Sequence, residues 1–101
     1  MDDLGLDIVR NIFCIESIKG EILKNLGILY KKMADNSDNN ELSAILSKVC
    51  LLNYLLAKKL GISYARLELD MLDLLKKNDL EYLSKEDVTS LYEHIGRRTK
   101  E

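Results

Sequence analysis

The sequence has 101 residues, of which 47% are hydrophobic and 32% charged, and it contains no proline. This composition excludes a disordered chain, and the length fits one domain over residues 1–101. The formal net charge of −2 offers no basic surface to a nucleic acid. The acidic N-terminus is unlike a signal peptide, and the longest apolar run, residues 49–57, is too short for a membrane span. We therefore expect a cytoplasmic protein without a nucleic-acid or membrane partner.

Apolar residues recur every three or four positions in the first third of the chain, which predicts a helix over residues 6–34 with one buried face. This face consists of Ile8, Ile12, Ile15, Ile18, Ile22, Leu26, Leu29 and Met33. Gly20 and Gly27 share another face, and each costs about 1 kcal/mol relative to alanine inside a helix. Close packing of a neighbouring helix explains them better than room for a ligand does.

The polar run at residues 35–40 predicts a loop, with Asn40 as the cap of a second helix over residues 41–60. Residues 49–57 are apolar on nearly every side, so other helices or a second subunit must surround them. Asn53 interrupts this run. We expect it to bond to a helix carbonyl, to fix the helix register or to meet its symmetry mate, with a ligand role ranked last.

The cysteines Cys14 and Cys50 are too few for a disulfide scaffold, and their apolar helical surroundings predict small core residues. Ser63 is the expected cap of a third helix over residues 64–78. Part of this segment alternates like a strand. Its good helix formers and the lack of a second strand to pair with favour the helix.

Ser84 and Asp87 resemble a capping box at the start of a short fourth helix over residues 85–95, which Gly96 is expected to end. The four predicted helices describe an all-α, four-helix bundle-like fold. Because the second helix presents more apolar faces than three helices can cover, we expect a homodimer.

Carboxylates on helices are the remaining candidates for chemistry. The sequence contains one histidine, His94, and no glycine-rich phosphate loop or nucleophile elbow. Acids at i,i+3 on facing helices can hold Mg²⁺ through oxygen ligands. Glu21 lies beside the buried face of the first helix, three positions after Ile18, and Glu41 opens the second helix, three positions before Ala44. From spacing alone, we expect Glu21 to be a surface charge flanking the buried face and Glu41 to be a charge that stabilises the start of its helix.

The segment ELSAILSKVCLLNYLLAKKLGIS at residues 41–63 resembles MazG-type proteins, which read E-L-x-D and then an apolar helix ending in L-A-x-x-L-G-I-D. LKKN at residues 75–78 is similar to the lysine–asparagine that closes the family's next helix. Gly20, Glu21 and Ile22 are similar to the end of its E-E-V-G-E-L segment. The resemblance covers roughly residues 8–78 and follows the order of the family's helices.

This resemblance implies an all-α, dimeric protein related to enzymes that hydrolyse nucleoside triphosphates to the monophosphate and pyrophosphate. Such enzymes hold Mg²⁺ on two acidic pairs, E-x-x-E and E-x-x-D. Glu21 matches the second acid of the first pair, and Glu41 matches the first acid of the second pair. The other two acidic positions are Ile18 and Ala44, so half of the metal site is missing.

The resemblance also implies substrate-binding residues. Lys77 and Asn78 match the family's closing lysine and asparagine, whereas its lysine four positions before the asparagine falls at Leu74. Two hypotheses follow. The first is a nucleotide-binding, at most weakly pyrophosphohydrolytic protein that uses the four matched residues. The second is a catalytically inactive, homodimeric helical interaction module. Convergence of the helical acids on one pocket would favour the first.

Overall fold

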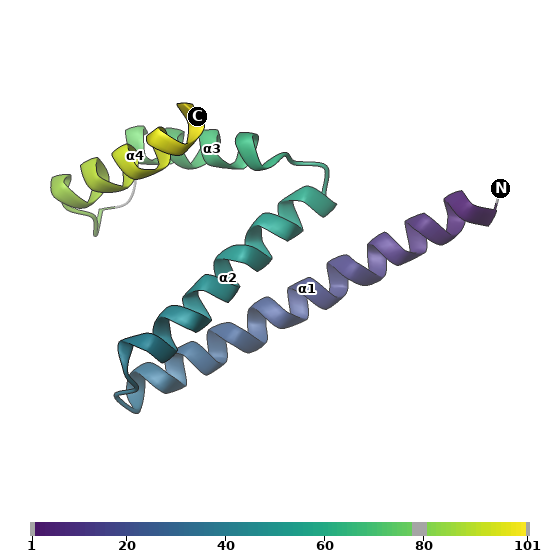
Figure 1. The fold of residues 1–101 in the computed structure, drawn as a ribbon, viewed down its shortest axis with the longest axis horizontal. Coiled ribbons are helices and arrows are strands. Elements are labelled where there is room, and N and C mark those ends of the chain that lie inside the picture. Colours follow the sequence, from purple (N-terminus) through teal and green to yellow (C-terminus); the bar gives the residue numbers. More distant parts are fainter. Residues whose placement is uncertain (1, 78–80, 101) are drawn as a thin grey trace. The chain divides into compact units, whose positions relative to one another are not determined.

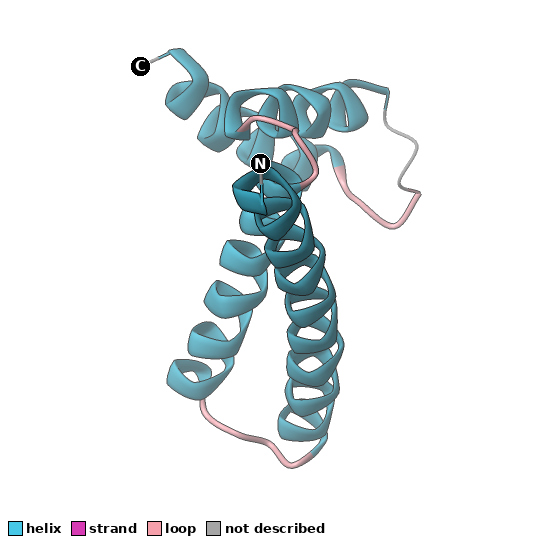
Figure 2. Cartoon of the chain, turned by 90° about the vertical axis from the view of Figure 1, so that its right-hand side faces the viewer, coloured by secondary structure: helices cyan, strands magenta, loops and turns pink. Residues whose placement is uncertain are grey.

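The computed structural model describes residues 2–77 and 81–100, with side chains over residues 5–77 and 81–97. Within these residues it contains four α-helices and no strand, which confirms the all-α prediction (Figures 1 and 2). The helices are α1 (Asp2–Ala34), α2 (Asn39–Lys59), α3 (Tyr64–Lys77) and α4 (Lys85–Lys100). None of the described helices is long and apolar enough to cross a membrane.

The chain divides into two compact units, residues 1–61 and 62–101. In the first unit, α1 and α2 form an antiparallel hairpin (Figure 1). The least exposed apolar side chains of this hairpin are Leu29 and Ala57. Five half-buried residues of α2 recur every three or four positions and so form one face: Leu42, Ile45, Val49, Leu52 and Leu56.

Part of the predicted buried face of α1 is exposed. Ile15, Ile18, Ile22 and Leu26 are half-buried and Leu29 is buried, as expected, but Ile8, Ile12 and Met33 are exposed. The length of α2 explains the exposure of Ile8. The Asn11 side-chain amide donates to the Lys59 carbonyl at the end of α2, at 3.3 Å. Residues of α1 before this point therefore extend past α2 (Figure 1).

The apolar run of α2 is also less covered than its sequence predicts. Leu51, Leu55 and Asn53 are exposed in the single chain. Cys50 is exposed and Cys14 half-buried, so only Cys14 approaches the predicted core position. Within this hairpin α1 covers only one side of α2, so the apolar side chains on the other side of α2 face outwards.

The loop between α1 and α2 places the cap two residues earlier than predicted. Asp38, and not Asn40, is the N-cap of α2, and its Oδ1 accepts the Glu41 backbone N–H at 2.9 Å. Asn40 is already helical because α2 begins at Asn39. Asn36 adopts φ 57°, a left-handed conformation that asparagine tolerates better than most residues.

The second helix ends as the sequence predicts. Gly61 takes φ 89°, a conformation that favours glycine, directly after the C-cap Leu60. In the second unit, Ser63 Oγ accepts the Arg66 N–H at 3.1 Å, which confirms Ser63 as the cap of α3. These two features fix the end of one helix and the start of the next.

The second unit is a hairpin of α3 and α4 with Leu75 and Ile95 as its most buried side chains. The capping box of α4 is confirmed. Ser84 Oγ accepts the Asp87 N–H at 3.1 Å, and Asp87 Oδ2 accepts the Ser84 N–H at 3.4 Å. The predicted end of α4 is wrong, because the helix continues through Gly96 to Lys100. A glycine without positive φ weakens a helix but does not stop it.

The cap of α2 gives a direct test of this geometry. Asp38→Ala should lower the free energy of unfolding by about 1 kcal/mol, because the Glu41 N–H loses its acceptor. Asn40→Ala is the matched control and should change it by less than about 0.5 kcal/mol. Urea unfolding of both variants measures the difference. A larger loss for Asn40→Ala would show that the loop caps α2 as the sequence first suggested.

Candidate functional site

Glu21 lies on the face of α1 that packs against α2, where a small polar cluster forms. Its Oε2 lies 3.6 Å from Lys48 Nζ of α2. The Asn25 side-chain amide donates to the Glu21 carbonyl at 2.7 Å and approaches Oε2 at 3.4 Å. The Glu21 carboxylate therefore already has one cationic partner and one amide partner within the hairpin.

Glu41 stands in the first turn of α2, near the other end of the hairpin. Its Oε2 lies 3.7 Å from Lys32 Nζ in the last turns of α1. Both side chains are about half exposed, so the ion pair is a weak one of the surface type. Like Glu21, Glu41 has the ammonium group of the facing helix as its nearest opposite charge.

The hairpin keeps the two carboxylates apart along its length. Glu21 lies opposite Lys48, whereas Glu41 lies opposite Lys32. Lys32 follows Glu21 by three helical turns of α1, a rise of about 16 Å. Within the described residues no three His, Cys, Asp or Glu side chains group as a metal site would require. The matched acids thus share a hairpin without sharing a site.

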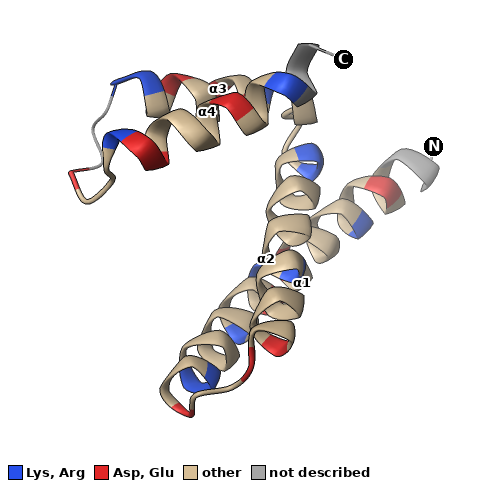
Figure 3. Cartoon of the chain, turned by 60° about the vertical axis from the view of Figure 1, so that its left-hand side comes forward, with Lys and Arg blue, Asp and Glu red and all other residues tan. Residues whose placement is uncertain are grey.

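Two further helical acids, Glu16 and Asp70, are also paired locally. Glu16 Oε1 lies 3.1 Å from Lys19 Nζ, and Asp70 Oδ1 lies 3.2 Å from Arg66 Nε. Acidic and basic residues are interspersed along both units (Figure 3). Each of these carboxylates is held by a neighbouring cation on its own helix.

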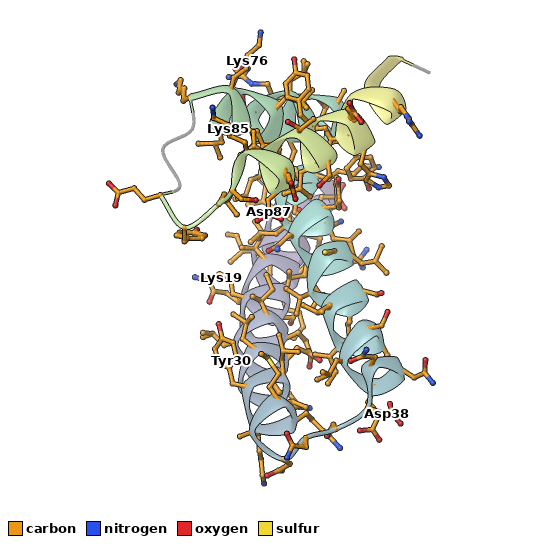
Figure 4. All side chains as sticks on the ribbon, turned by 90° about the vertical axis from the view of Figure 1, so that its left-hand side faces the viewer. Lys19, Tyr30, Asp38, Lys76, Lys85 and Asp87 are labelled. Carbon is orange, nitrogen blue, oxygen red and sulfur yellow. The ribbon has the colours of Figure 1, made fainter. Side chains whose placement is uncertain are left out.

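Of the predicted substrate-binding residues, the structure places one. Lys77 is exposed in the last turn of α3, and Asn78 lies outside the described residues. The preceding lysine, Lys76, lines an open groove of about 420 Å³ within the α3–α4 unit, together with Lys85 (Figure 4). Leu75, Val88, Thr89 and Tyr92 complete its walls. The groove therefore has two lysines and one tyrosine among its lining residues.

Asn25 is a residue that the sequence reasoning missed. It is 5% exposed and is the most buried polar residue of the described chain. The signal is visible in the sequence, since Asn25 falls three positions after Ile22 and four before Leu29, inside the buried face. A polar residue at a core position predicts a specific bond, here to the Glu21 carbonyl.

The MazG-like family matches residues 8–92 of the chain. No curated protein and no solved structure matches the chain. Because the match covers most of the sequence, the chain belongs to the MazG-like family. The family fits the all-helical fold and confirms the resemblance that the segments around Glu21 and after Glu41 indicate.

The buried amide of Asn25 can be tested by replacing it with leucine. Asn25→Leu should raise the free energy of unfolding by about 1 kcal/mol, because it buries apolar surface and the Glu21 carbonyl keeps its helical hydrogen bond. Chemical unfolding measures this. A comparable loss of stability would instead show that the Asn25 bonds to Glu21 contribute strongly to the hairpin.

Proposed function

We propose that this MazG-like protein binds a nucleoside triphosphate and hydrolyses it weakly or not at all. Family membership supports the nucleotide as ligand. One observation supports the loss of hydrolysis: Glu21 and Glu41, the two acids that match the family's metal site, are each paired with a lysine of the facing helix. A positive charge stands beside each carboxylate where a metal-dependent site needs free oxygen ligands.

The residues present do not fit a magnesium centre. Mg²⁺ requires near-ideal octahedral geometry and usually takes one or two carboxylates together with phosphate oxygens and water. The two matched acids lie about three helical turns apart along the hairpin, so they cannot bind one ion together. The proposal is therefore that Mg²⁺ binding is weak and that no step of chemistry depends on it.

The nucleotide itself would be held by the basic residues of the α3–α4 unit. Lys77 matches the family's lysine, and Lys76 and Lys85 line the groove beside it. Ammonium groups bind phosphate oxygens as point charges. This assignment extends the family resemblance from one lysine to three neighbouring ones.

Pyrophosphate release tests the catalytic part of the proposal. With each common nucleoside triphosphate and either Mg²⁺ or Mn²⁺, the protein should release pyrophosphate no faster, or only slightly faster, than the protein-free control. Calorimetry should show no tight Mg²⁺ binding. Multiple turnovers together with low-micromolar Mg²⁺ affinity, both lost in Glu21→Gln, would contradict the proposal and restore an enzymatic role for Glu21.

Thermal unfolding tests the binding part. A nucleoside triphosphate in excess should raise the melting midpoint of the parent protein, because a ligand that binds the folded state stabilises it. Lys77→Ala should abolish this rise, whereas Lys24→Ala, an exposed lysine on α1, should retain it. Equal rises of the melting midpoint in both variants would show that Lys77 is not part of the binding site.

A second function is favoured by a separate observation. Many large apolar side chains of the hairpin are exposed, among them Phe13 at 73% and Leu23 at 74%. Exposed apolar surface of this extent is typical of an interaction site. The alternative proposal is a catalytically inactive homodimeric interaction module. A nucleotide panel that leaves the melting midpoint unchanged, with a dimer in solution, would favour this alternative. Under either proposal we place the protein in the cytoplasm.

A further inference from the structure

The long helix α1 carries a second apolar face, opposite the one that contacts α2. Its members follow one another at alternating spacings of three and four residues, and we call them the outer seam: Leu6, Val9, Phe13, Glu16, Gly20, Leu23, Gly27 and Tyr30. Every member is exposed in the chain. Figure 4 shows Tyr30 on the side of α1 turned away from α2.

The spacing of the outer seam is that of a coiled-coil heptad. A three–four repeat keeps one line of side chains in contact with a partner helix. In α1 the repeat is unbroken from Leu6 to Tyr30, a helical length of about 36 Å. Among the described atoms, none lies within 4 Å of a Cβ built on Gly20 or Gly27. A second helix can therefore approach the α1 backbone closely at these two positions.

We propose that the outer seam binds α1 of a second copy of this chain, in antiparallel orientation, with the two-fold axis at the level of Ile18. Residues equally far from Ile18 in the two directions then face each other. In this register every seam residue meets a seam residue: Leu6 with Tyr30, Val9 with Gly27, Phe13 with Leu23 and Glu16 with Gly20. The inference rests on the homodimer of the preceding section and assigns its interface.

Charge favours the antiparallel orientation. Parallel helices in register would place Glu16 against Glu16, two like charges at the centre of the seam. Antiparallel helices bring Glu16 next to Lys19 of the second copy, so that two Glu16–Lys19 pairs, each 3.1 Å within its own chain, meet at the axis. Arg10 would lie near Lys24 of the second copy.

The apolar area agrees with a second copy as the occupant. The five large apolar residues of the seam expose on the order of 600 Å² per copy, near the lower end of stable protein interfaces. The α2 surface around Leu51 and Leu55 offers fewer exposed apolar residues over a shorter length. The seam is also complementary to itself, which a symmetric dimer requires.

Two leucines on opposite helices provide a matched test. Leu23 of the seam is 74% exposed and Leu51 of α2 is 64% exposed. Both therefore accept glutamate without disturbing the fold of the single chain. In sedimentation equilibrium the parent protein and Leu51→Glu should be dimers, and Leu23→Glu should be a monomer with unchanged helix content by circular dichroism.

Disulfide cross-linking tests the orientation. In a background without Cys14 and Cys50, Val9→Cys and Gly27→Cys are prepared as separate proteins. Their mixture should cross-link under mild oxidation, and neither protein alone should do so, because like positions lie about 27 Å apart along antiparallel helices. Cross-linking of each protein alone would show parallel helices and contradict the proposed register.

The remaining outcomes separate the interface from the dimer. If Leu51→Glu is monomeric and Leu23→Glu dimeric, the homodimer stands and the outer seam is not its interface. If the parent is a monomer at high micromolar concentration, both the dimer and the seam assignment are wrong. A monomeric parent whose melting midpoint falls in Leu23→Glu would show that the seam is covered from within the same chain.

Discussion

The packing of α1 against a helix shorter than itself determines most of what the hairpin can do. α1 has 33 residues and α2 has 21, so α2 covers one face of α1 along part of its length. A pair of helices encloses little volume, and among the described side chains of this hairpin the buried apolar ones are Leu29 and Ala57. The hydrophobic effect therefore leaves a strong drive for a further surface to cover the outer face of α1.

The same packing explains the state of the candidate site. Because α1 and α2 are antiparallel, Glu21 meets Lys48 and Glu41 meets Lys32 at different levels of the hairpin. Each carboxylate is balanced by one ammonium group, as expected for polar residues flanking a helical interface. The chain belongs to the MazG-like family, and each of the two acids that match the family's metal site has a lysine of the facing helix as its partner.

The sequence predicts the helix caps well, but it does not predict which residues of one helix lie opposite which residues of the next. Ser63 and the Ser84–Asp87 box were predictable because a cap involves residues three positions apart in the chain. The wrong cap Asn40 and the wrong helix end at Gly96 came from residues that suit several positions near a helix terminus. The exposure of Ile8 depends on where α2 ends in space, which periodicity does not specify.

The site followed the same division. The resemblance identified Glu21, Glu41, Lys77 and Asn78 from short segments, but their partners depend on the register between helices. Lys48 and Lys32 became recognisable only when α2 was placed beside α1. The outer seam shows the converse case. Its heptad spacing is present in the sequence. The isoleucines of the face that contacts α2 form a stronger pattern, so the seam is recognised only once the covered face of α1 is known.

Our central claim is that a second copy of the chain covers the outer face of α1. Thermal unfolding followed by far-ultraviolet circular dichroism, over about a hundredfold range of protein concentration, tests this claim directly. Because association stabilises the folded chain, the claim predicts a melting midpoint that rises steadily with protein concentration. A midpoint that is the same at every concentration would contradict the claim and show that the folded chain does not associate.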